Sequence, residues 1–279
     1  MIRLLGLRPS RASGTTAIPS CEAIAIVVRV ERRSINPTST LDLVHLLHSN
    51  SCTPKARNGA RCKYLTVSTS HDPTLGIKLP TVHHVGEQLP VRLNPTTWDK
   101  YPRIKGATGG LPSSIKRSDL SESASNTNWM DDSSIERLFV HTMAWGSGTT
   151  NGRGPRYTDQ ALAQGHVGET LRKARALLQD GHPGAAYHLH KKISRVGPAF
   201  FTKQLWAIDT QLDSADQCLI LDARVWSALG KHNWNSIDAA DGSRRWADRY
   251  VAYLRACARW ADDAEAKPED VEFTLFGMS

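Results

Sequence analysis

A glycine–proline pair at positions 197 and 198 constrains the fold of this chain more than any other feature of its sequence. Apolar residues recur at helical spacing on both sides of the pair. Proline has a fixed φ and no backbone N–H, so it is favoured at the first position of a helix and disfavoured inside one. The sequence therefore predicts a helix over residues 185–193, a short hairpin, and a second helix that begins at Pro198.

The hairpin belongs to a longer helical pattern that starts after Trp129. From there on, apolar residues recur three or four positions apart, and capping residues precede several of the runs. Besides the two helices of the hairpin, we expect helices from Ser133 or Ser134 to Trp145, from Thr158 to about Leu178, from Asp222 to Leu229, from Arg244 to Ala261, and from Pro268 onward. The predicted fold class is mainly α, with a helical domain over residues 129–279.

The part of the chain before this domain has a different composition. Residues 1–120 hold 17 Lys and Arg against 7 Asp and Glu, whereas residues 121–279 hold 18 against 20. Residues 1–80 show little periodicity and are expected to form an irregular, basic and weakly ordered N-terminal region. Prolines and glycines recur over residues 81–128, which predicts an extended segment packed on the core. A basic arm suits a polyanionic partner such as DNA, and a solvated leader explains it equally well.

Composition also excludes several classes of protein. No run approaches 18 consecutive apolar residues, so we expect no membrane span. The five cysteines lie too far apart for a disulfide framework or a zinc ribbon, so free thiols in a reducing cytoplasm are expected. His188 and His190 are two positions apart and point to different faces of a helix. We therefore expect no metal site. The protein is also expected to be a monomer and to hold no cofactor.

The hairpin itself has the features of a phosphate-binding element. A hairpin between two helices presents backbone N–H groups and a helix N-terminus to a phosphate without reading bases. No acidic residue lies between Asp180 and Asp209, although four basic residues do. At Gly197 we expect a backbone conformation, or a close approach of the phosphate, that a Cβ would block. The predicted DNA-binding residues are Lys191, Lys192, Arg195, Val196, Gly197 and Pro198.

The order of hairpin, lysine and aspartate resembles the active-site order of the helix–hairpin–helix DNA glycosylases. Lys203 lies in the helix after the hairpin, and Asp222 follows 19 residues later as an expected helix N-cap. The segment Val-Gly-Pro-Ala-Phe-Phe-Thr-Lys, with Met-Ala-Trp-Gly-Ser-Gly upstream, is most similar to bacterial proteins with the 8-oxoguanine DNA glycosylase fold, over residues 85–279. Relatives of endonuclease III carry four closely spaced cysteines near the C-terminus. This chain has only Cys257 there, so no iron–sulfur cluster is expected.

The resemblance implies excision of a damaged or modified base from double-stranded DNA. Lys203 would attack the sugar C1′, with a possible AP-lyase activity, in an apolar setting provided by Phe200, Phe201 and Trp206. Asp222 would stabilise the positive charge that develops on the deoxyribose, and the helix dipole would keep its carboxylate ionised.

Two features depart from the pattern of this family. The lysine usually lies about two residues after the hairpin glycine, a position that Ala199 holds here, so Lys203 lies one helical turn further along. The loop before the aspartate is usually rich in Gly and Pro, but residues 209–221 contain neither. If Lys203 does not reach the sugar, Asp222 can direct water instead, as in adenine-mismatch glycosylases that lack the lysine.

A glycine-rich segment over residues 145–157 supplies candidates for a base pocket. It lacks the Gly-Lys-Ser/Thr of a P-loop, and its Gly-x-Gly does not follow a strand as a dinucleotide site requires. A flipped base needs stacking and polar partners. The candidate pocket residues are Trp145, Arg153, Arg156, Tyr157 and Phe200. As a plain loop between helices, the segment needs no function.

Three functions therefore remain open at this point. The first is a DNA glycosylase, acting either in repair or in defence against phage DNA that carries modified bases. The second is a non-catalytic DNA-binding protein in which the hairpin only holds DNA. The third is a helical interaction protein whose basic arm binds RNA or another partner. Lysine trapping separates the first two, and salt-dependent DNA binding separates both from the third.

Overall fold

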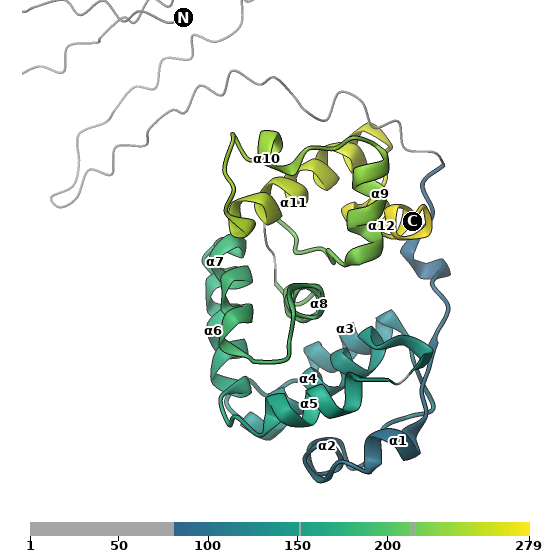
Figure 1. Ribbon diagram of the computed structural model, residues 1–279, viewed down its shortest axis with the longest axis vertical. Helices are drawn as coiled ribbons and strands as arrows, with labels where there is room; N and C mark the ends of the chain where they lie inside the picture. Colours follow the sequence, from purple (N-terminus) through teal and green to yellow (C-terminus); the bar gives the residue numbers. More distant parts are fainter. Residues whose placement is uncertain (1–80, 151, 213, 215) are drawn as a thin grey trace, which may run out of the picture. The chain divides into compact units, whose positions relative to one another are not determined.

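The computed structural model of the protein describes residues 81–150, 152–212, 214 and 216–279 (Figure 1). The basic region predicted over residues 1–80 lies outside the described residues. The described part is mainly helical, which confirms the predicted fold class. Its helices are α1 (Pro95–Asp99), α2 (Pro102–Thr108), α3 (Arg117–Ser125), α4 (Asp132–Gly146), α5 (Gly154–Leu162), α6 (Val167–Gln179), α7 (Pro183–His188), α8 (Pro198–Asp209), α9 (Ala223–Lys231), α10 (Ser236–Ala239), α11 (Trp246–Asp263) and α12 (Pro268–Gly277).

Short elements complete the described part of the chain. Strands β1 (Val91–Arg92) and β2 (Ser114–Ile115) pair antiparallel, with Val91 opposite Ile115. Three 3-10 turns accompany the helices: η1 (Val85–Glu87), η2 (Gly148–Thr150) and η3 (Leu189–Lys192). None of the described helices is both long enough and apolar enough to cross a bilayer.

Helix α8 is surrounded by other helices because its buried residues cover most of its circumference. Every residue from Phe201 to Asp209 is buried, so α8 needs neighbours on several sides. Helices α3, α4, α6 and α7 contact it. Figure 1 shows α8 nearly end-on, between α3–α5 on one side and α9–α12 on the other. The helix that carries Lys203 is therefore fixed by packing from Phe201 to its end.

Residues 81–128 form three helices instead of the extended segment that their prolines and glycines predicted. Pro95 and Pro102 stand in the first turns of α1 and α2, where a missing N–H has no intrahelical partner to lose. Gly109 ends α2 in the left-handed conformation, with a φ of 70°. Trp98 and Ile104 are fully buried. The prolines and glycines of this region thus mark helix boundaries within a packed part of the chain.

Two later helix boundaries also differ from the prediction. Asp131, not Ser133 or Ser134, caps α4, and its carboxylate accepts the backbone N–H groups of both serines. The single helix expected from Thr158 to about Leu178 is two helices, α5 and α6. Gly165 turns the chain between them with a φ of 71°, a conformation that glycine adopts without steric cost.

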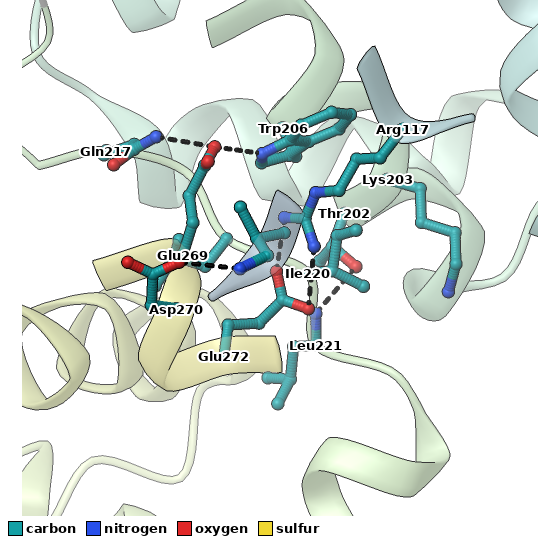
Figure 2. A network of polar contacts seen from close by, with 12 residues as sticks. Arg117, Thr202, Lys203, Trp206, Gln217, Ile220, Leu221, Glu269, Asp270 and Glu272 are labelled. Carbon is teal, nitrogen blue, oxygen red and sulfur yellow. Dashed lines mark hydrogen bonds and ion pairs between the residues drawn. The ribbon is translucent and has the colours of Figure 1, made fainter. Parts of the chain in front are cut away.

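A buried ion pair joins α3 to the last helix of the protein (Figure 2). Nη2 of Arg117 donates to Oε2 of Glu272 in α12 over 2.6 Å, and the two side chains are 7% and 3% exposed. The same guanidinium lies 4.3 Å from the centroid of the Trp206 ring in α8. Burial raises the pKa of the Glu272 carboxyl against the opposing effect of Arg117. One charged cluster therefore connects α3, α8 and α12.

Removing one partner of this pair is expected to destabilise the fold strongly. Glu272→Ala leaves the Arg117 guanidinium buried without its carboxylate, which costs about 3–5 kcal/mol of unfolding free energy. The double variant Arg117→Met/Glu272→Leu removes both charges, so its stability is expected to lie closer to that of the wild type. Urea unfolding of all three proteins measures this difference. A double variant less stable than Glu272→Ala would contradict the prediction. It would indicate that Arg117 stabilises the fold mainly through its contact with the Trp206 ring.

Candidate active site

Lys203 and Asp222, the two residues predicted to be catalytic, are in contact. Nζ of Lys203 donates a hydrogen bond to Oδ2 of Asp222 over 3.0 Å. The Lys203 side chain is 9% exposed and that of Asp222 is 15% exposed. An ion pair that is largely removed from water is screened less than one on the surface. Lys203 thus reaches the aspartate although it lies one helical turn beyond the position that the family pattern gives to the lysine.

Two neighbours enclose the Lys203 side chain. The ring centroid of Phe200 lies 5.8 Å from Nζ of the lysine. Gly146 ends α4 so close to this side chain that a Cβ there would lie 2.8 Å from Cδ of Lys203 and 3.1 Å from the Phe200 ring. A side chain at position 146 would therefore displace the lysine. Gly146 belongs to the motif Met-Ala-Trp-Gly-Ser-Gly, but its packing against Lys203 was not predicted from the sequence, because its closest contacts come from a helix more than 50 positions away.

Asp222 is the N-cap of α9, as the sequence predicted. Its Oδ1 accepts the backbone N–H groups of Arg224 and Val225 over 3.0 and 3.2 Å, while its Oδ2 faces Lys203. Burial by itself would raise the pKa of Asp222. The Lys203 ammonium and the two N–H groups outweigh burial and hold this pKa below its ordinary value. The carboxylate is therefore ionised at neutral pH and held through both oxygens.

Two tyrosines of α11 hold the backbone that leads into Asp222. Tyr250 donates its hydroxyl to the carbonyl oxygen of Leu219, and Tyr253 donates to that of Ile220, each over 2.9 Å. Both tyrosine side chains are fully buried. These bonds fix a segment that has neither glycine nor proline. The sequence did not reveal this role, because tyrosines at this helical spacing are also typical of an ordinary core.

Helix α8 contributes a third contact to the same backbone. The Oγ1 atom of Thr202 accepts the N–H of Leu221 over 3.1 Å (Figure 2). Thr202 directly precedes Lys203, and Leu221 directly precedes Asp222. A displacement of α8 would therefore move the lysine and the backbone beside the aspartate together.

The predicted hairpin connects a 3-10 turn to α8. Helix α7 ends at His188 and η3 continues the chain to Lys192, so the helix predicted over residues 185–193 is shorter than expected. Nδ1 of His190 lies 2.8 Å from the carbonyl oxygen of Tyr187, an oxygen that a continued α-helix would use for its own ladder. Of the predicted DNA-binding residues, Val196 is buried, and the exposed ones are Lys191, Lys192, Arg195, Gly197 and Pro198.

Gly197 does not have the unusual backbone conformation that the sequence suggested. Its φ is −73°, and a Cβ added to it would meet no atom within 4 Å. Arg195 takes the left-handed conformation instead, with a φ of 68°. A side chain at position 197 would therefore disturb nothing in the free protein. A close approach of a phosphate remains the predicted reason for glycine at this position.

The start of α5 lies beside the hairpin. The guanidinium of Arg195 lies 5.7 Å from the ring centroid of Tyr157, and that of Arg156 lies 5.2 Å from it. Arg153 and Arg156 are exposed, and their hydrogen bonds to Tyr157 lower the pKa of its hydroxyl. These three residues, predicted to line a base pocket, thus extend the basic surface of the hairpin.

A cavity of about 510 Å³ opens beside Asp222. Its walls come from α7, η3 and the starts of α8, α9 and α11, and they include Tyr187, Lys191, Ala199, Asp222, Trp226 and Trp246. None of the five residues predicted for a base pocket lines it. Trp145 is only 5% exposed and stacks on Trp206, with ring centroids 6.3 Å apart. The aromatic residues of the cavity were not identified as site residues from the sequence.

A mainly helical domain in which a hairpin precedes a Lys–Asp pair is arranged as the resemblance to helix–hairpin–helix DNA glycosylases implied. Residues 85–276 match the model of the family described as "Putative 8-oxoguanine DNA glycosylase OGG-like protein". The chain belongs to this family, and the resemblance predicted over residues 85–279 is confirmed. None of the curated proteins and none of the solved structures matches the chain.

Gly197→Ala is expected to weaken DNA binding without unfolding the protein. The free protein has room for the Cβ, so its melting temperature should change by no more than a few degrees. A bound phosphate that approaches the backbone closely would meet the methyl group. Fluorescence anisotropy with duplexes of several sequences measures the loss, which should be equal for all of them.

Gly86→Ala is the matched control, because this glycine also has open space around its Cβ position and lies outside the hairpin. Equal affinities of the wild type, Gly86→Ala and Gly197→Ala would contradict the assignment of the hairpin to phosphate binding.

Proposed function

We propose that the protein excises a base from double-stranded DNA by attack at C1′ of the deoxyribose, with Lys203 as the nucleophile and Asp222 as the assisting carboxylate. Membership of the OGG-like family indicates a DNA glycosylase. The roles of Lys203 and Asp222 are supported by the buried contact of 3.0 Å between Nζ of Lys203 and Oδ2 of Asp222. The hairpin ahead of α8 supplies the exposed basic surface that a DNA backbone requires.

The contact defines a path for the proton that the nucleophile must lose. A lysine attacks as a neutral amine, so its ammonium first passes a proton to a base. Oδ2 of Asp222 already accepts a hydrogen bond from Nζ, and no other acidic residue of the described part of the chain lines the neighbouring cavity. The amine then forms the N–C1′ bond while the C1′–base bond breaks. The base leaves with the bonding electrons and takes the proton from Asp222, whose carboxylate is then ionised again.

Asp222 also suits the charge that develops during this exchange. The sugar becomes cationic as the base departs, and a fixed carboxylate stabilises that charge. The backbone N–H groups of Arg224 and Val225 hold Oδ1 in place, so Asp222 needs no rearrangement before the reaction. The sugar ring then opens by breaking of the C1′–O4′ bond, and the proton lost from nitrogen passes to O4′. This leaves a Schiff base on Lys203, which is the intermediate of an AP lyase.

Lys203→Ala is expected to abolish covalent trapping on DNA. Borohydride reduces a Schiff base to a stable amine, so the wild type should form a cross-linked complex with substrate DNA. The substrate is found by incubating the protein with duplexes that carry oxidised, mismatched or phage-modified bases and scoring abasic sites. Lys105→Ala, which removes an exposed lysine of α2, is the control and should trap normally.

Trapping that persists in Lys203→Ala would refute the role of the lysine. Base release by the wild type without any trapping would make water the nucleophile, with Asp222 as its activating group. DNA binding without base release from any duplex would favour the non-catalytic alternative.

Asp222→Asn is expected to slow excision by about 100- to 1000-fold, because it removes the charge that stabilises the sugar cation. Asparagine is also a good N-cap, so α9 should stay folded. Asp131→Asn is the matched control, since Asp131 caps α4 through the same two kinds of backbone contact. Single-turnover excision and thermal melting are measured for both variants. Excision at the wild-type rate in Asp222→Asn would reduce this aspartate to a helix cap.

A further inference from the structure

The cavity beside Asp222 contains aromatic rings that the proposed reaction does not use. Trp226, Trp246 and Tyr187 line it. Trp246 is 50% exposed and Trp226 is half-buried, and their ring centroids lie 5.4 Å apart with an interplanar angle of 56°. Indole rings exposed in this way can stack on any nucleobase, because every base has a π face.

Arg249 holds the two indoles in a fixed arrangement. Its guanidinium carbon lies 3.8 Å from the ring centroid of Trp246 and 5.2 Å from that of Trp226. Its Nε donates to Oγ of Ser236 over 2.8 Å, which ties the guanidinium to α10. Because the rings are already positioned, a ligand that stacks on them loses little free energy to ordering the protein.

The rim of the cavity favours an anion. Lys191, Arg244 and Arg245 line it and are exposed, whereas Asp222 is the only acidic residue among the lining residues that the structure describes. The first turns of α8 and α11 open onto the same cavity, and the N-terminal ends of helices add positive potential. The aromatic side chains of the cavity suit the base of a nucleotide, and its exposed basic side chains suit the phosphate.

We propose that this cavity binds a nucleotide that flanks the target in the same DNA strand. Its base leaves the duplex stack and lies on Trp246 and Trp226, and its phosphate lies at the basic rim. The inference rests on the proposed function, because that function places the sugar of the target nucleotide at Lys203 and Asp222. A strand that runs from the hairpin to this pair passes the mouth of the cavity, since the first turn of α8 and Asp222 both line it. Of this pair only Asp222 lines the cavity. The cavity therefore begins beside the target sugar and not at the nucleophile, so we assign it to the neighbour of the target.

A flanking nucleotide that lacks its base tests this placement directly. Duplexes carry a stable, non-cleavable analogue at the target position, with either a normal nucleotide or a tetrahydrofuran abasic analogue on its 5′ side or on its 3′ side. On one of the two sides, the wild type is expected to bind the duplex with the abasic analogue roughly 5- to 150-fold more weakly than the duplex with the normal nucleotide, because a base–aromatic stack is lost. Trp246→Ala should bind both duplexes of that pair with nearly equal affinity. Fluorescence anisotropy gives the four dissociation constants.

Two further variants keep the result interpretable. Trp246→Phe retains a ring and should restore most of the discrimination between the two duplexes. Trp129→Ala is the matched control: this partly buried tryptophan also lies under an arginine, with Arg175 5.2 Å from its ring centroid, but it does not line the cavity. It should discriminate as the wild type does.

Discrimination that is unchanged in Trp246→Ala, or absent from the wild type on both sides of the target, overturns the inference. Because the DNA is never cleaved in this assay, a protein that fails to excise any base still gives a readable result. Normal excision without discrimination would instead refute the flanking site alone.

Discussion

The arrangement of the site depends on the Asp222 carboxylate, which caps a helix with one oxygen and contacts Lys203 with the other. Oδ1 of Asp222 accepts two backbone N–H groups in the first turn of α9, and Oδ2 accepts a hydrogen bond from Lys203. If either contact were absent, the other would be less well placed: without the cap the side chain would be free to rotate, and without the lysine a half-buried charge would lack its partner. The start of α9 and the middle of α8 are therefore joined at the point where the proposed chemistry takes place. The tyrosine bonds from α11 make the backbone before Asp222 equally rigid.

The parts of this arrangement that sequence reasoning predicted are those fixed by local rules. Gly197–Pro198 predicts the start of α8 because proline at the first helical position is a local preference. Asp222 as an N-cap follows from its side-chain chemistry and from the apolar pattern after it. The start of α12 at Pro268 follows for the same reason as that of α8. By contrast, the same residue type misled the prediction for residues 81–128, since proline and glycine mark helix ends as well as extended chain.

The remaining features depend on contacts between distant positions. Arg117 and Glu272 are 155 positions apart, and nothing near either residue indicates that the other neutralises it. Trp246 has the helical spacing of a core residue relative to Tyr250 and yet is half exposed, because its helix begins at the edge of the cavity. The importance of Gly146 appears only when α4 is placed against α8. Such features follow from packing, and a single sequence carries no direct signal for packing.

The unusual position of the lysine has a structural counterpart. Ala199, which holds the position usual for the lysine, lies in the first turn of α8 and lines the cavity. Lys203 lies one turn deeper, where α8 is buried on several sides and where Gly146 leaves room for its stem. Moving the amine inward by one turn separates two requirements that conflict when they share a surface. In the proposed function the hairpin must stay exposed to hold a phosphate, whereas the Lys–Asp contact gains strength from exclusion of water. The small residue at position 199 leaves the first turn of α8 open for the DNA strand of the proposed reaction, so the proposal places both requirements on a single helix.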